Sequence, residues 1–165
     1  MDRSDERFMQ RALEVAARAG RTSPNPRVGA VLVREGEVVA EAEHEGAGTP
    51  HAEARVLSSG DGLGATLYVT LEPCVHYGRT PPCAPLVLES GVARVVAAME
   101  DPDERVLGRG FALLEGAGIE VTRGVLEDEA RLLNLAYVHH RTTGLPLISL
   151  KLALSLDGRL GAPDG

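Results

Sequence analysis

The sequence predicts an α/β fold of three layers, α/β/α, in which helices cover both faces of a mixed five-stranded sheet. Five strand-like apolar runs occur along the chain, and the last three alternate with helix-like segments, which is typical of parallel strands joined by helical crossovers. The first two runs are joined by a short segment with Glu35-Gly36, which predicts a hairpin and so an antiparallel pair. A chain of 165 residues, 44% of them apolar, can build one domain around a hydrophobic core.

The first part of the chain is expected to hold a helix, the hairpin and a second helix. Phe8, Ala12 and Val15 recur at helical spacing, which predicts a helix over residues 4–19. The segment "SPNP", residues 23–26, is expected to be a loop because each proline disfavours helix in the residue before it. The other elements of this part are strands at 27–33 and 37–43 and a helix from Pro50 to Ser59.

Strands and helices alternate through the second part. The expected strands cover residues 65–73, 93–99 and 118–124, and the expected helices cover residues 84–91, 110–118 and 126–142. Gly144-Leu145-Pro146 then ends the last helix, since glycine and proline both interrupt helical structure.

The end of the chain has a different pattern. Residues 147–160, "LISLKLALSLDGRL", predict a new apolar strand, which is followed only by "GAPDG". A strand that begins a unit in this way favours a truncated start of a further domain, and an edge strand or swapped arm of the same domain is the alternative. We therefore divide the chain into a domain at residues 1–144 and a tail at residues 145–165.

Composition and charge restrict the function. A net charge of −7 disfavours a nucleic acid as the main partner. No apolar run approaches the ~20 residues that span a bilayer, and the N-terminus lacks the apolar region of a signal peptide. These features predict a cytoplasmic protein that acts on neither nucleic acid nor membrane.

The segment "PCVHYGRTPPC", residues 73–83, contains both cysteines of the protein, Cys74 and Cys83. In a reducing compartment a disulfide is disfavoured, so paired cysteines indicate metal binding or catalysis. Inert core thiols explain the two cysteines equally well when they are considered alone.

A zinc site needs a third ligand, and one histidine is marked by its neighbours. His51 stands two residues before Glu53 at an expected helix start, so one can bind metal while the other moves protons. Three protein ligands leave the fourth zinc position open, as in catalytic sites. H-x-E followed by P-C-x-x-C is the signature of zinc-dependent nucleobase deaminases, although this chain has eight residues between its cysteines. The other candidate histidines are His44, His76, His139 and His140.

The segments "HAE", "TLEPCVHYGRTPPC" and "LKLALSLDGR" resemble the RibD family of bacterial riboflavin biosynthesis, which fuses a pyrimidine deaminase to a reductase. The resemblance runs from about Phe8 to the last residues and includes "SPNPRVGAVLV", His44 and the "DP…GRG" of residues 101–110. It implies a cytidine deaminase-like fold and one zinc ion. The implied zinc ligands are His51, Cys74 and Cys83, with Glu53 as the catalytic proton shuttle.

The resemblance also implies a reaction. The substrate would be 2,5-diamino-6-ribosylamino-4(3H)-pyrimidinone 5′-phosphate, and the products would be 5-amino-6-ribosylamino-2,4-pyrimidinedione 5′-phosphate and ammonia. Zinc would activate water, and Glu53 would carry one proton of that water to a ring nitrogen and then a second proton to the leaving amine.

Five residues are candidate substrate contacts. Asn25 matches a family position that holds the ring, and His44 matches a histidine that lines the family's pocket. His76 and Arg79 lie within the cysteine loop, and Asp101 fits a ribose contact. Asn25 offers a donor and an acceptor to the pyrimidinone edge, and Arg79 is suited to the 5′-phosphate. This chain departs from the family at Asp103 and Glu104, where Asn-Pro is usual. An added carboxylate there would repel a phosphate unless it points away.

In the tail, Lys151, Ser155 and Asp157 match the opening of the family's reductase domain. Because the rest of that domain is absent from this sequence, we expect no reductase activity and no NADPH site, with the reductase either removed or on a separate chain. We also expect a homo-oligomer. Two alternatives are another deaminase, acting on guanine, cytidine or tRNA adenosine, and a non-catalytic structural zinc module that would leave Glu53 unexplained.

Overall fold

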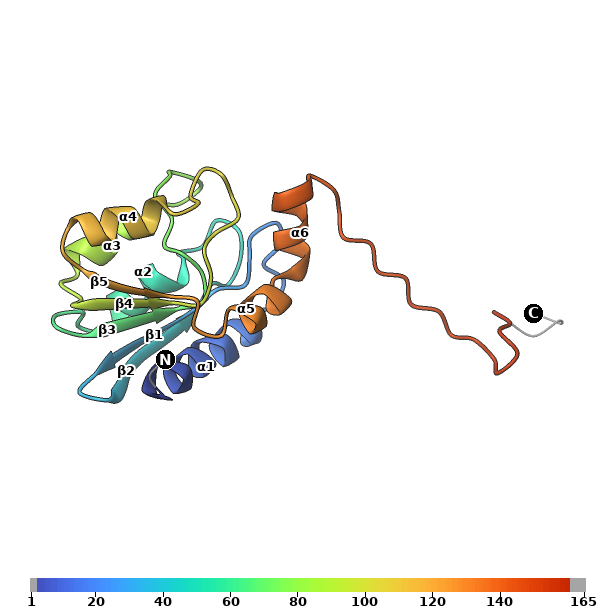
Figure 1. Cartoon of the computed structure of the whole chain (residues 1–165), viewed down its shortest axis with the longest axis horizontal. Helices are drawn as coiled ribbons and strands as arrows, with labels where there is room; N and C mark the ends of the chain where they lie inside the picture. The colour runs from blue at the N-terminus through green and yellow to red at the C-terminus, as the bar shows by residue number, and fades with distance from the viewer. Residues whose placement is uncertain (1–2, 161–165) are drawn as a thin grey trace.

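Five strands form one mixed sheet in the computed structural model, which describes residues 3–160 (Figure 1). The strand order is β2-β1-β3-β4-β5, with antiparallel pairing on both sides of β1 and parallel pairing from β3 to β5. The strands are β1 (Gly29–Arg34), β2 (Glu37–Glu43), β3 (Thr66–Val69), β4 (Arg94–Ala97) and β5 (Glu120–Arg123). The predicted five-stranded mixed sheet and the hairpin that opens it are confirmed.

Helices cover both faces of this sheet, as expected (Figure 1). One face carries α1 (Arg3–Arg18), with α5 (Glu127–Leu133) packed beside it. The other face carries α2 (Ala52–Ser59), α3 (Cys83–Glu89) and α4 (Arg109–Gly116), which contact one another in that order. A sixth helix, α6 (Leu135–Thr143), follows α5 and precedes the tail.

The hairpin turn uses an unusual backbone at two positions. Glu35 and Gly36 both have positive φ angles, 52° and 81°. This is the geometry of a two-residue type I′ turn, whose twist matches that of the flanking strands. The short turn pairs Arg34 with Glu37 and Val33 with Val38, and the register then shifts by one residue between Val33 and Leu32.

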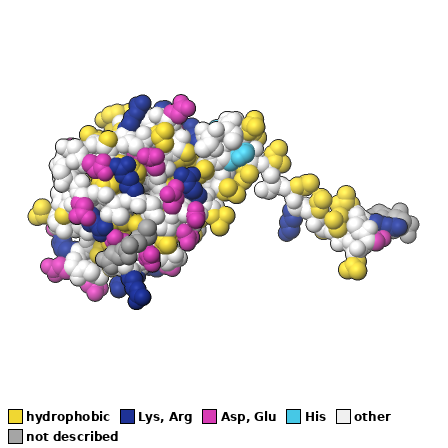
Figure 2. All heavy atoms as spheres, viewed as in Figure 1, with side chains coloured by type: hydrophobic (Ala, Val, Ile, Leu, Met, Phe, Trp, Pro, Cys, Tyr) yellow, Lys and Arg dark blue, Asp and Glu magenta, His cyan; other side chains and the backbone are white. Residues whose placement is uncertain are grey.

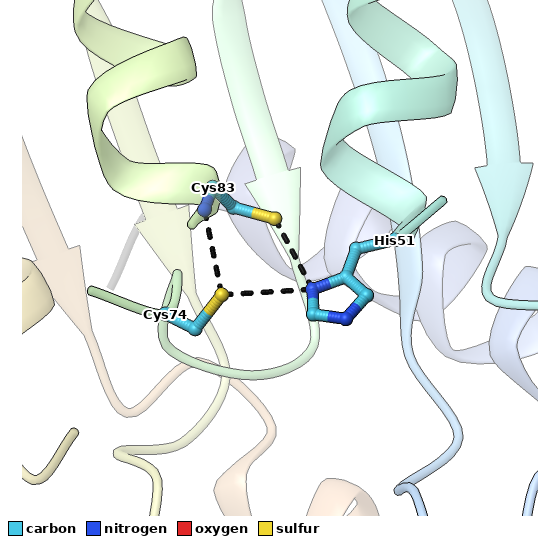
Figure 3. A group of neighbouring side chains, drawn as sticks. All are labelled: His51, Cys74 and Cys83. Atoms are coloured by element: carbon cyan, nitrogen blue, oxygen red, sulfur yellow. Dashed lines mark hydrogen bonds between the residues drawn. The ribbon is translucent and has the colours of Figure 1, made fainter. Parts of the chain in front are cut away.

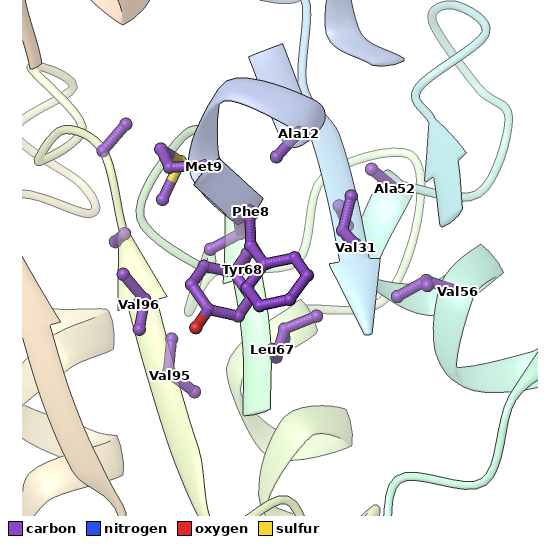
Figure 4. Packing of buried hydrophobic residues seen from close by; sticks show 14 of the residues in the cluster. Phe8, Met9, Ala12, Val31, Ala52, Val56, Leu67, Tyr68, Val95 and Val96 are labelled. Carbon is purple, nitrogen blue, oxygen red and sulfur yellow. The ribbon is translucent and has the colours of Figure 1, made fainter. Parts of the chain in front are cut away.

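Buried apolar side chains form a core on both faces of the sheet, with Phe8 and Met9 of α1 on one face and Ala52 and Val56 of α2 on the other (Figure 4). Phe8 of α1 packs on Tyr68 of β3 with ring centroids 5.3 Å apart. Below this pair the Tyr68 hydroxyl donates to the buried carboxylate of Asp5, which also accepts two hydrogen bonds from Arg94 at 2.7 and 2.9 Å. The buried charge of Asp5 is thus paired, and α1 is fastened to β3 and β4.

The single helix expected over residues 126–142 is in fact two helices that meet at Asn134. Asn134 has φ −110° and ψ 24°, and its side-chain amide accepts from Arg27 N at 2.8 Å and donates to Arg27 O at 2.9 Å. This pair of hydrogen bonds satisfies the backbone of the loop before β1 and breaks the helix. The residues involved are 107 positions apart, so local periodicity could not reveal the break.

The second helix begins later than expected. Pro50 lies outside α2, and His51 is the N-cap residue with an extended backbone (φ −70°, ψ 163°).

The expected strand at residues 147–160 is not formed within the described part of the chain, where this segment is extended, exposed and leads away from the domain (Figures 1 and 2). Residues 161–165, which include "GAPDG", lie outside the described residues, and the division at residue 144 stays a prediction. None of the helices within residues 3–160 is long and apolar enough to cross a membrane.

Gly29 makes the close packing of α1 on β1 possible. A Cβ atom at this position would lie 2.1 Å from Ala12 O and 2.6 Å from Ala16 N, both of which are backbone atoms of α1. We expect Gly29→Ala to lower the free energy of unfolding by roughly 1–3 kcal/mol, because α1 must shift to relieve the overlap. Urea unfolding followed by circular dichroism measures this change.

The matched control is Gly116→Ala, whose added Cβ would meet no atom within 4 Å. That substitution should leave stability unchanged or raise it slightly, since alanine favours helix over glycine. Equal stability of the two variants would contradict the close packing described here.

Candidate metal centre and active site

One edge of the sheet gathers the candidate functional residues. The carboxyl ends of the parallel strands β3 and β4 lie at this edge, and β1 runs the opposite way, so the loop that enters β1 lies there too. Crevices at the carboxyl ends of strands are the usual ligand sites of open α/β sheets. Here they form a pocket of about 230 Å³.

Three side chains that can bind a metal meet beside this pocket, and two of them, His51 and Cys74, line it (Figure 3). His51 caps α2, Cys74 follows β3, and Cys83 is the first residue of α3. The Nδ1 atom of His51 lies 3.6 Å from Cys74 Sγ and 3.3 Å from Cys83 Sγ. All three ligand atoms lie within 4.8 Å of one another, and Cys83 N donates to Cys74 Sγ at 3.4 Å.

The donor set fits a zinc ion. Ligands at ordinary zinc distances around a tetrahedral ion are separated from one another by roughly 3.5–3.8 Å. The nitrogen–sulfur separations at this site are close to that value. One nitrogen and two sulfurs are ligands that zinc prefers, and three protein ligands leave one tetrahedral position open.

The pKa values of the two thiols are shifted in opposite directions. The hydrogen bond from Cys83, together with that from His51, lowers the pKa of Cys74 to about 4. The same hydrogen bond, together with burial, raises the pKa of Cys83 well above its ordinary value. The Cys74 side chain therefore provides a thiolate, the form that binds metal.

Glu53 lies in the first turn of α2 and lines the same pocket with only 4% of its surface exposed. Burial, followed by the negative charge of Cys74, raises its pKa to about 7. A carboxyl group in this environment both accepts and returns protons near neutral pH.

The two residues expected to face the pyrimidine ring are hydrogen-bonded to each other. Asn25 Nδ2 lies 2.9 Å from His44 Nε2, and His44 Nδ1 lies 3.3 Å from the carbonyl oxygen of Pro50. Since an amide nitrogen only donates, Nε2 accepts and Nδ1 carries the proton. Burial lowers the pKa of His44, in keeping with a neutral ring.

The remaining expected residues also line this pocket. His76 Nδ1 is buried without a hydrogen-bond partner among residues 3–160. Arg79 is exposed at the rim and forms no ion pair within the described part of the chain. Asp101 is buried and accepts from Tyr137 Oη at 2.8 Å, through the same oxygen that accepts from Asp103 N.

Asp103 forms an ion-pair cluster that the sequence did not reveal. Its carboxylate accepts from Arg105 and lies 3.4 Å from Arg141 Nη1 on α6. The hydrogen bonds from Arg105 hold the pKa of Asp103 well below its usual range. Arg105 and Arg141 together outweigh the charge of Asp103 by one positive charge, which offsets the repulsion that an unpaired carboxylate would exert on a phosphate.

Glu72 is a second residue that sequence reasoning missed. Its buried carboxylate accepts backbone N–H groups at 2.7–3.3 Å from a loop and the start of α4; the donors are Asp101, Gly108, Gly110 and Phe111. Glu72 stands two residues before Cys74, so it fixes the loop after β4 to the metal loop. In the sequence, the only feature that could have pointed to Glu72 is its position directly before Pro73-Cys74.

Comparison with known proteins defines the class first. Residues 2–99 match the family model described as "Cytidine and deoxycytidylate deaminase zinc-binding region". This match covers more than half of the chain, and the chain belongs to that family of zinc-binding deaminases.

Individual relatives are more specific. The chain is 51% identical over 165 residues to riboflavin biosynthesis protein RibD of Escherichia coli (strain K12), covering 98% of this chain and 45% of the relative. Acinetobacter baumannii RibD (form 1) superposes with a TM-score of 0.92 at 48% identity, covering 94% of this chain and 45% of that one. A third relative is the diaminohydroxyphosphoribosylaminopyrimidine deaminase/5-amino-6-(5-phosphoribosylamino)uracil reductase of Thermotoga maritima. Its structure superposes with a TM-score of 0.93 at 43% identity, covering 98% of this chain and 48% of that one. The resemblance to the RibD family is confirmed, and the chain spans about half the length of these relatives.

We expect the purified chain to bind one zinc ion, and His51→Gln to abolish most of this binding because it removes the only nitrogen donor of the cluster. Elemental analysis after gel filtration gives the zinc content. Chelation should lower the melting temperature of the parent, because metal binding is linked to folding, and should have little effect on the variant.

The control is His140→Gln, which alters an exposed histidine of α6 and should keep one zinc ion per chain. Full zinc content in His51→Gln would refute the proposed ligand set.

Proposed function

We propose that this chain catalyses the zinc-dependent hydrolytic deamination of 2,5-diamino-6-ribosylamino-4(3H)-pyrimidinone 5′-phosphate, giving 5-amino-6-ribosylamino-2,4-pyrimidinedione 5′-phosphate and ammonia. The observation that carries the proposal is the buried carboxylate of Glu53 in one pocket with His51 and Cys74, which form a cluster of metal donors with Cys83. The similarity to RibD proteins supports the choice of substrate. A cytoplasmic location, a homo-oligomer and the lack of NADPH binding stay predictions.

His51, Cys74 and Cys83 would hold the zinc ion. When bound, zinc supplies a Lewis acid that makes water nucleophilic at neutral pH. Glu53 takes a proton from the attacking water and gives it to a ring nitrogen, which makes the amino-bearing carbon more electrophilic. Glu53 then transfers the second water proton to the leaving amine, so that ammonia departs and a carbonyl remains. Burial of Glu53 keeps bulk water from competing for these protons.

The ring and the ribose find complementary groups in the same pocket. The Asn25 amide directs Nδ2 to His44, which leaves its oxygen to accept from an N–H of the pyrimidinone edge. His76 lines the same pocket. Asp101 uses one carboxylate oxygen for Tyr137 and Asp103, so the other can accept from a ribose hydroxyl.

Arg79 is placed to bind the 5′-phosphate. Its guanidinium stands at the pocket rim with no competing carboxylate among residues 3–160. Pro81 and Pro82 follow in the sequence and restrict the loop, which lowers the entropy cost of fixing Arg79 on the ligand. The net positive charge of the Asp103 cluster adds to the attraction.

Glu53→Gln should retain zinc and fold but lower turnover by about 10²–10⁴-fold, because an amide of similar size cannot accept and return a proton. Ammonia release from the diaminopyrimidinone phosphate measures turnover. The parent should prefer this substrate over cytidine and guanine assayed in parallel.

Glu89→Gln is the control, because Glu89 is an exposed carboxylate outside the pocket at the end of α3. Glu89→Gln should release ammonia at the same rate as the parent. Activity of Glu53→Gln within a few-fold of the parent would exclude the shuttle role. No ammonia release from any substrate by the zinc-loaded parent would favour a structural zinc module.

Arg79→Ala should lower kcat/KM for the phosphorylated substrate by about 10–150-fold, the equivalent of a charge-assisted contact worth roughly 1.5–3 kcal/mol, with zinc content unchanged. The dephosphorylated nucleoside should be a poor substrate for the parent, and Arg79→Ala should lower kcat/KM for this nucleoside little further. The four kcat/KM values form a double-mutant cycle in which the phosphate is the second partner.

Arg109→Ala removes an equal charge outside the pocket and serves as the control. Equal losses on both substrates in Arg79→Ala would show that Arg79 does not recognise the phosphate.

A further inference from the structure

The imidazole of His51 has polar neighbours on two sides. Nδ1 faces the two thiols, at 3.6 Å from Cys74 and 3.3 Å from Cys83. Nε2 lies 3.2 Å from the hydroxyl oxygen of Thr80. Thr80 belongs to the eight-residue segment between the cysteines, so one loop supplies both metal sulfurs and the group on the far side of the ring.

The direction of this hydrogen bond follows from the chemistry of the ring. A neutral imidazole carries one proton, and a nitrogen that binds metal must be the unprotonated one. With Nδ1 facing the metal donors, the proton is on Nε2 and needs an acceptor. The Thr80 hydroxyl is the only hydrogen-bond partner of Nε2 among residues 3–160.

Other polar groups near the ring are already engaged. The ring of His44 stands edge-on to that of His51 with centroids 5.1 Å apart. Its two nitrogens are occupied by Asn25 and by the carbonyl oxygen of Pro50. His44 therefore packs against His51 without taking its proton.

The loop holds Thr80 in place by several constraints. Pro81 restricts the backbone of Thr80 to extended conformations, and the β-branched side chain has few rotamers. Gly78 N donates to Thr80 O at 3.2 Å, and Ala84 N donates to Cys74 O at 3.0 Å, which closes the loop at its base. A loop of only two residues between the cysteines could not extend past His51 in this way.

We propose that Thr80 is a positioning residue of the metal centre: its hydroxyl accepts the Nε2 proton of His51 and so holds the ring in the tautomer and orientation that present Nδ1 to the metal. Partners of this kind behind a ligating histidine typically change metal affinity by roughly 10–100-fold. The inference rests on the metal site of the proposed function and is independent of the identity of the substrate.

The test replaces the hydroxyl and measures zinc affinity by competition with a chromophoric chelator. Thr80→Val keeps the shape but cannot accept a hydrogen bond, and should weaken zinc binding by roughly 10–100-fold. Thr80→Ser restores the acceptor and should bind zinc within a few-fold of the parent. Thr80→Ala also removes the hydroxyl and should weaken zinc binding as much as Thr80→Val does. The melting temperatures of the metal-free proteins show whether each variant folds.

Thr49→Val is the matched control, because the Thr49 hydroxyl is near the pocket but donates to Gly46 O and not to a metal ligand. Its zinc affinity should equal that of the parent. Nitrogen-15 NMR of the zinc-loaded proteins gives a second measurement. The Nε2 proton of His51 should be protected from exchange in the parent and Thr80→Ser, and should exchange rapidly in Thr80→Val.

Equal zinc affinity and equal Nε2 protection in the parent, Thr80→Val and Thr80→Ala would overturn the role of Thr80 and leave the proposed function intact. A folded parent that binds no zinc would overturn both. Weak zinc binding by Thr80→Val and Thr80→Ala, with affinity recovered in Thr80→Ser, would support the proposal.

Discussion

The site depends on the direction of one strand. β1 runs antiparallel to β3, whereas β3 and β4 are parallel, so the chain enters β1 at the edge where it leaves β3 and β4. Asn25, Cys74 and Asp101 come from these three segments and line one pocket. A sheet with β1 and its hairpin partner β2 reversed would place both Asn25 and His44 at the opposite edge, and the pocket would lose this hydrogen-bonded pair.

Buried hydrogen bonds turn this arrangement of loops into a fixed pocket. The Glu72 carboxylate binds the backbone of the loop after β4, and the Thr70 hydroxyl accepts from Gly29 N at the start of β1. Both residues follow β3 directly, so the central strand connects its two neighbours at the site edge. A buried carboxylate with only backbone donors is costly to disturb, because removing one partner leaves polar groups unsatisfied. The metal loop and the loop after β4 are thereby held as one unit.

Sequence reasoning predicted what is encoded locally. The Glu35-Gly36 turn, the alternation of strands and helices, and the grouping of His51 with the cysteines all follow from spacing and residue type. The break at Asn134 was missed because its cause is a hydrogen bond to a distant loop. The segment at residues 147–160 has the apolar pattern of a strand, but a strand also needs a hydrogen-bonding neighbour. The cluster around Asp103 was missed for a similar reason, since Arg141 comes from the last helix.

The break at Asn134 also sets an order of assembly. All three metal donors and Glu53 precede residue 84, whereas Tyr137 and Arg141, which complete the pocket wall, belong to α6. A chain emerging from the ribosome thus contains every group of the metal centre long before it can enclose a substrate. Asn134 turns the last helix toward the loop before β1 only when both segments are present. The residues of the metal centre are therefore synthesised first, and the residues that complete the pocket wall are synthesised last.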